Sequence, residues 1–391
     1  MAKFSATGGY RPLEGVFVKR LNRFLVECEV EGHKQKAFLP NPGRLWEYLF
    51  PGAVLLLNPC TLSPTRKTRL TVSGILKDGT WVMLDTHTSN KAVSWLVSHQ
   101  LIPGLEDSRV IREEVSFGNS RFDLLLQDTE GPLFLEVKSC TLFGNSIAMF
   151  PDAPSERAAR HVRELQENSR KGGRSGILFL VHSRKPSYFL PDYHTDPAFA
   201  RALYDARHDI RILAASVAWE RDLTIGEERT GILDIPWSVI EKEDRDSGSY
   251  LVILELAADQ DIFIGSLGRV HFKSGFYVYV GSAARGLEQR LSRHMRKRKR
   301  FHWHIDHLRD HAQKVRVLPI RTSFPLECIL ADRMRIISEG SIIGFGSSDC
   351  GCPSHLFYMK EDPVRQRAFV QAVMDLRINR IEPLIQGSQF R

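Results

Sequence analysis

The stretch between residues 13 and 90 constrains the fold most, because it packs six short strand-like segments between frequent turn residues. The segments are rich in β-branched and aromatic residues and read GVFVKRL, RFLVECEV, KQKAFLP, AVLLLNP, RLTVSGIL and WVMLDT. Gly, Pro, Asn or a Lys-Asp-Gly turn separates them. Short strands joined by so little chain are typical of small closed sheets. We therefore predict a β-barrel as the N-terminal domain, residues 1–90.

Basic residues recur along these predicted strands and turns: Lys19, Arg20, Arg23, Arg44, Arg66, Lys67 and Arg69. In a barrel of the oligonucleotide-binding (OB) type, such residues would form a groove that follows the phosphates of a nucleic acid. The alternative is an ordinary solvated barrel face. We take Arg20, Arg23, Arg44, Arg66 and Lys67 as candidate nucleic-acid-binding residues.

From residue 91 the pattern changes to strands that alternate with helices, which predicts an α/β domain with a mixed sheet over 91–222. Apolar residues at helical spacing follow Ser155, a candidate N-cap, and Gly172-Gly173 would end this helix. Residues 223–247 are polar and charged with little periodicity, so we expect a linker. A second, smaller α/β domain is predicted over 248–372, followed by a C-terminal tail at 373–391.

The composition narrows the class of protein. A chain of 391 residues is long enough for several domains. Its formal net charge of +8 favours an anionic partner such as a nucleic acid, and the alternatives are an acidic membrane surface or a housekeeping enzyme with no anionic partner. There is no apolar run long enough to span a membrane and no N-terminal apolar leader, so we expect a cytoplasmic protein. The six scattered cysteines are expected to be reduced. The oligomeric state stays open, with a homodimer as one option.

Two carboxylates and a lysine interrupt apolar strands in RFDLLLQDTEGPLFLEVKSC, residues 121–140. The period of two in a strand places Glu136 and Lys138 on one face, and a hairpin would bring Asp123 to them. Two carboxylates can hold Mg²⁺ or Mn²⁺, which polarises a phosphate and lowers the pKa of bound water, while the lysine orients that water. The alternative is that all three residues lie on a solvated face.

The motifs around Asp123, Glu136 and Lys138 resemble those of a known protein family. The stretches LPNPGRL, RKT, TSN, REEVSFGNSRFDLLL, EVKSCTL and MFPDAPSERAARHVREL, in this order, resemble the sugar fermentation stimulation protein A family over about residues 10–220. The resemblance implies an OB-type barrel followed by a restriction-endonuclease-like PD-(D/E)xK core with Asp123, Glu136 and Lys138 as its motif. It further implies that Glu114 is an additional catalytic carboxylate and that Arg121, Asp152 and Arg157 are positioning residues, with Arg121 and Arg157 binding the nucleic acid. Arg160 stands where the family usually has a lysine.

A second constellation lies in the C-terminal domain. The triplets at 248–250 and 279–281, followed by a helix with Arg290 and a later helix opened by Glu327, resemble the GIY-YIG nuclease superfamily. The resemblance implies that Glu327 binds the metal, that Tyr250 or Tyr279 acts near the attacking water, and that Arg290 neutralises charge on the phosphate. The alternative is that the tyrosines simply line a half-buried sheet.

A basic helix is expected after residue 286. Arg290, Arg293, His294 and Lys297 fall at i, i+3, i+4 and i+7, so they share one helix face, which we expect to contact the phosphates of a nucleic acid. Trp303 nearby could stack on a base. The alternative is a solvated charged helix.

The close residues Cys350, Cys352 and His355 could bind Zn²⁺, with a fourth ligand from His302, His304 or Asp306. We favour the alternative, a turn whose cysteines pack as small apolar residues.

Together these patterns predict a DNA-binding protein with two nuclease-type modules that cleave phosphodiesters with Mg²⁺ or Mn²⁺. A non-catalytic DNA-binding or regulatory protein that retains nuclease folds is the alternative, and a ribonuclease is another.

Overall fold

The computed structural model describes residues 3–60, 68–117, 120–226 and 230–387. The chain divides into two compact units, Met1–Trp237 and Ser238–Arg391. Arg66 and Lys67, two of the candidate nucleic-acid-binding residues, lie outside the described residues. Within the described residues, no helix is both long and apolar enough to cross a membrane.

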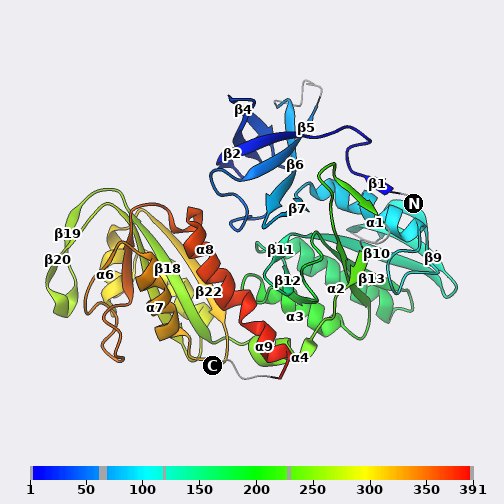
Figure 1. The fold of residues 1–391 in the computed structure, drawn as a ribbon. Coiled ribbons are helices and arrows are strands. Elements are labelled where there is room, and N and C mark those ends of the chain that lie inside the picture. The colour runs from blue at the N-terminus through cyan, green and yellow to red at the C-terminus, as the bar shows by residue number, and fades with distance from the viewer. Residues whose placement is uncertain (1–2, 61–67, 118–119, 227–229, 388–391) are drawn as a thin grey trace. The chain divides into compact units, whose positions relative to one another are not determined.

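The first unit begins with the predicted barrel, which is drawn in blue in Figure 1. Its five strands are β2 (Leu13–Asn22), β3 (Leu25–Val30), β4 (His33–Phe38), β5 (Val54–Pro59) and β6 (Leu70–Lys77). Antiparallel pairs join β4 to β3, β3 to β2, β2 to β5 and β5 to β6, and a short parallel pairing of β4 with β6 closes the ring. The sixth predicted strand, β7 (Thr80–Met83), extends the sheet from β6. The alternating inward residues form the barrel core, for example Phe17, Val26, Ala37, Leu57 and Val72.

The second part of the first unit is a six-stranded mixed sheet in the order β17-β15-β13-β10-β9-β8. These strands are β8 (Arg109–Phe117), β9 (Ser120–Asp128), β10 (Gly131–Cys140), β13 (Ser175–Val181), β15 (Arg211–Val217) and β17 (Thr230–Ile232). Strands β10, β13 and β15 run parallel, whereas β8, β9 and β10 form an antiparallel meander. A small sheet, β11 (Leu142–Phe143), β12 (Ile147–Phe150) and β14 (Tyr188–Pro191), accompanies it.

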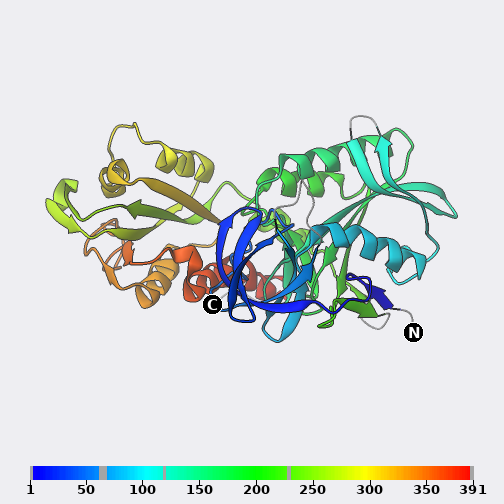
Figure 2. The ribbon, with the colours of Figure 1, turned by 90° about the horizontal axis from the view of Figure 1, so that it is seen from above.

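Helices cover both faces of the six-stranded sheet, as Figure 2 shows. Helix α1 (Thr86–Ser98) packs with Leu135 and Val137 on one face, and α2 (Glu156–Arg170) and α3 (Pro197–Ala206) pack on the other. Ser155 caps α2 as predicted, since its side chain accepts a hydrogen bond from the backbone N–H of Ala158. The predicted boundary between residues 90 and 91 falls inside α1, because Asp85 caps that helix earlier than the sequence pattern suggested.

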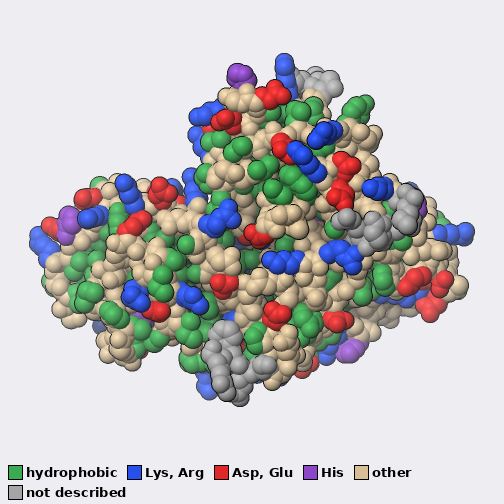
Figure 3. Space-filling model, in the orientation of Figure 1, with side chains coloured by type: hydrophobic (Ala, Val, Ile, Leu, Met, Phe, Trp, Pro, Cys, Tyr) green, Lys and Arg blue, Asp and Glu red, His purple; other side chains and the backbone are tan. Residues whose placement is uncertain are grey.

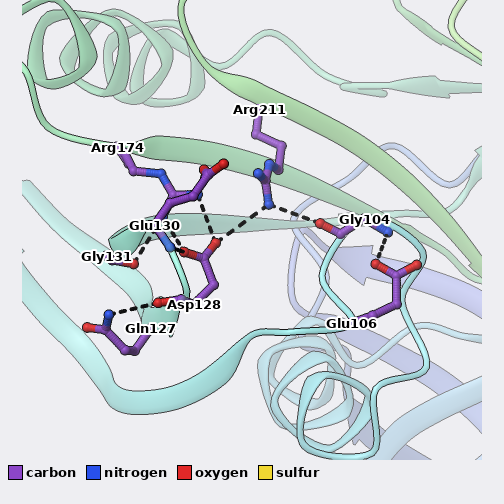
Figure 4. A network of polar contacts seen from close by, with 8 residues as sticks. All are labelled: Gly104, Glu106, Gln127, Asp128, Glu130, Gly131, Arg174 and Arg211. Carbon is purple, nitrogen blue, oxygen red and sulfur yellow. Dashed lines mark hydrogen bonds and ion pairs between the residues drawn. The ribbon is translucent and has the colours of Figure 1, made fainter.

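A charged network fixes the turn between β9 and β10 (Figure 4). Arg174 donates hydrogen bonds to both carboxylate oxygens of Asp128 and to Glu130, and Arg211 lies 4.0 Å from Asp128. The hydrogen bonds from Arg174 lower the pKa of Asp128. The turn is therefore tied to the parallel strands, which sets the register of the hairpin that carries Asp123 and Glu136.

The segment 223–247, expected to be a linker, contains regular structure instead. Strand β16 (Thr224–Gly226) pairs with the N-terminal strand β1 (Lys3–Ser5), β17 adds an edge to the large sheet, and α4 (Trp237–Glu243) follows. Some of its apolar residues, including Leu223 and Ile225, are buried in the core of the first unit, and this burial outweighs the polar composition.

The second unit is an antiparallel five-stranded sheet in the order β22-β18-β21-β24-β23, with helices packed against it. The strands are β18 (Gly248–Leu256), β21 (Gly275–Ala283), β22 (Lys314–Arg321), β23 (Gly340–Ser341) and β24 (Leu356–Met359), with a separate hairpin of β19 (Gln260–Phe263) and β20 (Arg269–Phe272). The helices are α5 (Leu287–Met295), α6 (His304–His311), α7 (Glu327–Ile337), α8 (Arg367–Met374) and α9 (Ile381–Ile385), and a π-helical turn (Asp375–Asn379) joins the last two. The expected tail from residue 373 is thus largely helical up to Ile385.

Candidate metal sites of the two units

The hairpin of β9 and β10 brings Asp123 and Glu136 to the same step of the sheet. The ladder between the two strands ends at the pair Leu124–Leu135, and Asp123 and Glu136 are the next residues on either side. Because the strands part here, the backbone N–H of Val137 is free to donate to Asp123 Oδ2, at 2.8 Å. Asn90 of α1 donates to the other oxygen of Asp123 at 2.7 Å. The hairpin therefore brings the carboxylates of Asp123 and Glu136 near each other, as predicted.

Glu136 is almost fully buried, with 3% of its surface exposed, and its two oxygens have different surroundings. Oε1 accepts hydrogen bonds from Lys138 Nζ at 2.5 Å and from His161 Nδ1 of α2 at 2.7 Å. Oε2 is buried and has no hydrogen-bond partner among the described residues. A buried carboxylate oxygen without a partner is costly unless a ligand satisfies it, so Oε2 fits a metal ion.

The two carboxylates differ in their ionisation. Burial, and then the charge of Glu136, raise the pKa of Asp123 to about 6. Burial acts in the same direction on Glu136, but the hydrogen bond from His161 and the charge of Lys138 outweigh it and hold the pKa of Glu136 below its ordinary value. Glu136 is therefore ionised at neutral pH, and Asp123 is the carboxylate whose charge responds to a bound cation.

These residues line a cleft of about 420 Å³, called the Asp123 cleft below. Lys138, Asn90 and Arg157 also line it, and Arg157 Nε lies 3.3 Å from His161 Nε2. The barrel forms part of its wall through Arg23 and residues 41–43. Asp152, at the rim, accepts a hydrogen bond from the backbone N–H of Leu45 in the barrel. No role was predicted from the sequence for Asn90 or His161, because each lies on a different element from the motif.

Four other candidate site residues of the first unit lie outside the Asp123 cleft. Glu114 and Arg121 pair with each other on the exposed edge of the sheet and do not line the Asp123 cleft. Arg20 is a structural residue, since its guanidinium group donates to four backbone carbonyls in residues 23–44. Arg44 lies over the ring of Trp46 at 5.1 Å. On the face of the molecule in Figure 3, basic and acidic side chains intermingle, so the excess positive charge is not concentrated in one patch there.

In the second unit the two triplets lie side by side on β18 and β21, with Tyr250 opposite Gly281. A Cβ atom at position 281 would lie 2.5 Å from the ring of Tyr250, so only glycine fits there. Tyr250 and Tyr279 are buried, and burial raises the pKa of each phenol. Both tyrosines are therefore neutral at physiological pH.

Glu327 and Arg290 approach the end of the same strand pair. Ser282 on β21 donates a hydrogen bond to Glu327 Oε2, and Arg290 donates to the backbone carbonyl of Ser282 at 2.7 Å. Burial alone would raise the pKa of Glu327, but the contacts with His355 and Ser282 hold it below its ordinary value. Glu327 is therefore an ionised carboxylate close to Tyr250 and Tyr279.

The predicted basic helix face is wrong in two respects. Helix α5 ends at Met295 and Arg296 is extended, so Lys297 lies beyond the helix. His294 is 1% exposed, and Tyr250 OH lies 3.0 Å from its Nε2. Burial and nearby Lys299 lower the pKa of His294 to about 3, so it is a neutral core residue and no phosphate ligand.

The aromatic and basic residues that follow α5 pack onto the second unit. The guanidinium groups of Arg290 and Arg293 each lie 4.8 Å from the centre of the Trp303 ring, which is only half-buried. Buried Asp306 forms ion pairs with Arg293 and Lys299. Charge pairing with Asp306 therefore competes with any contact to a nucleic acid at these side chains.

Cys350, Cys352 and His355 converge with a fourth residue that the sequence did not indicate. The ligand atoms of Cys328, Cys350, Cys352 and His355 all lie within 4.8 Å of one another. Cys328 is the second residue of α7 and lies more than 20 residues from the others in sequence, so no spacing signal links them. The ligands expected from residues 302–306 are not in this cluster, because Asp306 is engaged with Lys299 and His304 with Ser266.

Three family models match consecutive stretches of the chain. They are "SfsA N-terminal OB domain" over residues 18–84, "Sugar fermentation stimulation protein RE domain" over 87–222 and "Domain of unknown function DUF123" over 249–378. The matches agree with the mixed α/β architecture of a barrel, a restriction-endonuclease-like domain and a further α/β domain.

Relatives and a solved structure match the N-terminal half. The sugar fermentation stimulation protein homolog of Methanothermobacter thermautotrophicus is 38% identical over 192 residues, which is 49% of this chain and 80% of that protein. The homolog of Alkaliphilus oremlandii is 32% identical over 225 residues, covering 56% and 96% of the two chains. The structure of Pyrococcus furiosus SfsA in complex with Ca²⁺ is 30% identical with a TM-score of 0.55, covering 59% and 99%.

Proposed function

Since this chain belongs to the sugar fermentation stimulation protein family, whose OB and RE domains it carries, we propose that its first unit binds DNA and cleaves phosphodiester bonds with Mg²⁺ or Mn²⁺. The observation that carries the proposal is the unpartnered, buried Oε2 of Glu136 beside Asp123 in an open cleft. Oxygen ligands of this kind suit hard divalent cations. The Pyrococcus furiosus relative was solved with Ca²⁺, another hard cation that prefers oxygen ligands.

Asp123 and Glu136 would hold the cation. When bound, the cation would stabilise negative charge on the phosphate and lower the pKa of a water molecule bound to it. The surrounding residues prepare the site. Lys138 and His161 keep Glu136 ionised through Oε1 and leave Oε2 free. Asn90 orients Asp123, and Arg157 and Arg23 add positive charge along the cleft walls, where a phosphate backbone would lie.

The second unit is the candidate for an additional nuclease-type module of the GIY-YIG kind. Its support is the apposition of Tyr250 and Gly281 on neighbouring strands, with Glu327 and Arg290 at the strand ends. Glu327 would hold a cation, Arg290 would neutralise phosphate charge, and a tyrosine hydroxyl would position water. The family model that matches this stretch describes a domain of unknown function.

The experiment uses the full chain with supercoiled plasmid, single-stranded DNA, RNA and a DNA–RNA hybrid, each with Mg²⁺, Mn²⁺ or EDTA. Glu136→Gln should lower cleavage by at least about 100-fold, because it removes one of two metal-binding carboxylates. Glu113→Gln is the matched control, since this exposed glutamate lies outside the cleft and its loss should leave the rate unchanged. Glu327→Gln and the double variant separate the two units.

Each outcome decides between the candidate functions. Metal-dependent cleavage that Glu136→Gln abolishes supports the proposal, and the preferred substrate distinguishes a deoxyribonuclease from a ribonuclease. Binding of DNA that persists in Glu136→Gln and in EDTA, without cleavage of any substrate, would instead support a non-catalytic DNA-binding protein.

A further inference from the structure

We propose that Cys328, Cys350, Cys352 and His355 form a tetrahedral zinc site in the second unit. Three thiol sulfurs and one imidazole nitrogen converge from the start of α7 and from the loop that precedes β24. Three cysteines and one histidine are a common donor set of structural zinc sites. The proposal does not rest on the nuclease function, because its four ligands and its readout, zinc content, are separate from cleavage; Glu327 is the residue that the two proposals share.

The distances suit a single ion at the centre of the cluster. Zn–S bonds of about 2.3 Å and Zn–N bonds of about 2.0 Å at tetrahedral angles separate two sulfurs by about 3.8 Å and a sulfur from a nitrogen by about 3.5 Å. All ligand atoms lie within 4.8 Å of one another, and Cys350 Sγ lies 3.4 Å from His355 Nε2. Small rotations of the cysteine side chains would bring the four atoms onto one ion.

The imidazole of His355 already has the orientation that a metal ligand needs. Nε2 points to the cysteine cluster, while Nδ1 lies 3.3 Å from Glu327 Oε1 on the other side of the ring. A zinc-bound histidine usually presents its second nitrogen to a carboxylate, which fixes the ring and strengthens the ligand. His355 is 1% exposed, so this orientation is held by its surroundings.

The loop that carries three of the four ligands has a defined shape. The backbone N–H groups of Gly344 and His355 donate to the carbonyls of Pro353 and Phe345, both at 2.9 Å. The side chain of Phe345 is fully buried and anchors the loop in the core. The loop that presents Cys350, Cys352 and His355 is therefore tied to the core of the second unit by backbone hydrogen bonds and by Phe345.

The donor set distinguishes zinc from the cations proposed for the Asp123 cleft. Thiolates and imidazole suit Zn²⁺, whereas Mg²⁺ and Mn²⁺ prefer carboxylate oxygens and water. A disulfide is the competing use of two of these cysteines, but it would leave the third sulfur and the histidine without a shared role.

The test is metal analysis of the full chain, purified untagged under reducing conditions from cells grown with added zinc and then dialysed against metal-free buffer. We expect about one zinc per chain by mass spectrometry, because a closed four-ligand site holds zinc through dialysis. The Cys350→Ser/Cys352→Ser variant should lose it. Cys60→Ser is the matched control, since Cys60 lies in the first unit, and it should keep its zinc.

A second measurement, on the wild-type protein, tests the site even if the double cysteine variant fails to fold. Co²⁺ added to metal-free wild-type protein should give the thiolate charge-transfer and tetrahedral absorption bands, and zinc should abolish them. Glu327→Gln should bind zinc roughly 10–100-fold more weakly, because His355 loses its carboxylate partner. Less than about 0.1 zinc per chain, iron in its place, or zinc retained by the double cysteine variant would overturn the site.

Discussion

Replacing Asp123 with asparagine should stabilise the metal-free protein at pH 8. Asp123 is held beside buried Glu136, and burial and that charge raise its pKa from 3.8 to about 6. Asparagine is nearly the same size and carries no charge. Its amide oxygen can accept the hydrogen bond from Val137 N–H, and its amide nitrogen can donate to Asn90 once the Asn90 amide turns its oxygen toward it. The variant therefore removes the electrostatic cost of ionised Asp123 while it keeps the packing.

The sign and size of the effect follow from proton linkage. Between pH 3.8 and about 6 the folded protein keeps a proton on Asp123 that the unfolded chain has lost, so the free energy of unfolding falls as the pH rises through this window. The whole interval corresponds to roughly 3 kcal/mol. Asp123→Asn should thus be close to neutral at pH 4 and about 3 kcal/mol more stable than the wild type at pH 8.

The assay is urea unfolding in EDTA at pH values from 4 to 8, followed by tryptophan fluorescence, because five of the six tryptophans lie in the first unit. Asp128→Asn is the matched control with the opposite sign. Arg174 lowers the pKa of Asp128, so that substitution should cost more stability at pH 8 than at pH 4.

Added Mg²⁺ gives the complementary result. At about 100 times its dissociation constant it should add roughly 2.7 kcal/mol to the wild type, and much less to Asp123→Asn. A difference between wild type and Asp123→Asn that stays constant from pH 4 to pH 8 would refute the reasoning. Equal stabilisation of both proteins by Mg²⁺ would refute Asp123 as a ligand.

Three further substitutions test packing. Gly281→Ala should lower the stability of the second unit by about 1–3 kcal/mol in calorimetry, because its methyl group meets the Tyr250 ring, whereas Gly340→Ala, with open space around it, should have little effect. Tyr250→Phe should cost about 1–3 kcal/mol in the same scan, since buried His294 loses its partner; an unchanged melting temperature would contradict that contact. Arg20→Lys should destabilise the barrel by about 2 kcal/mol in urea titration, because an ammonium cannot reach all the carbonyls that the guanidinium binds.

Local signals in the sequence were enough to predict the hairpin that carries the first site. The apolar strands and the turn at residues 128–131 determine the antiparallel pair, and the period of two places Glu136 and Lys138 on one face. The barrel was predictable for the same reason, since each of its strands pairs mostly with a neighbour in sequence.

Long-range contacts were not predictable in this way. His161 reaches Glu136 from a helix, and Cys328 meets Cys350 only after the second unit has folded. The end of α5 was missed because arginine and lysine favour helices locally, and the attraction of Lys299 to buried Asp306 draws the following chain away from the helix. Tertiary electrostatics overrode propensity at that point.

The contact between Asp152 and the barrel loop has a practical consequence for dissecting this protein. Gly43 lies so close to Asp152 that a Cβ atom there would be 2.4 Å from the carboxylate. A fragment that starts at the RE domain would keep the three motif residues but would open one side of their cleft to water and leave the Asp152 carboxylate without its backbone donor from residue 45. Truncations made to isolate the RE domain should therefore retain the barrel, because a fragment that lacks the barrel and shows no activity would not test the motif.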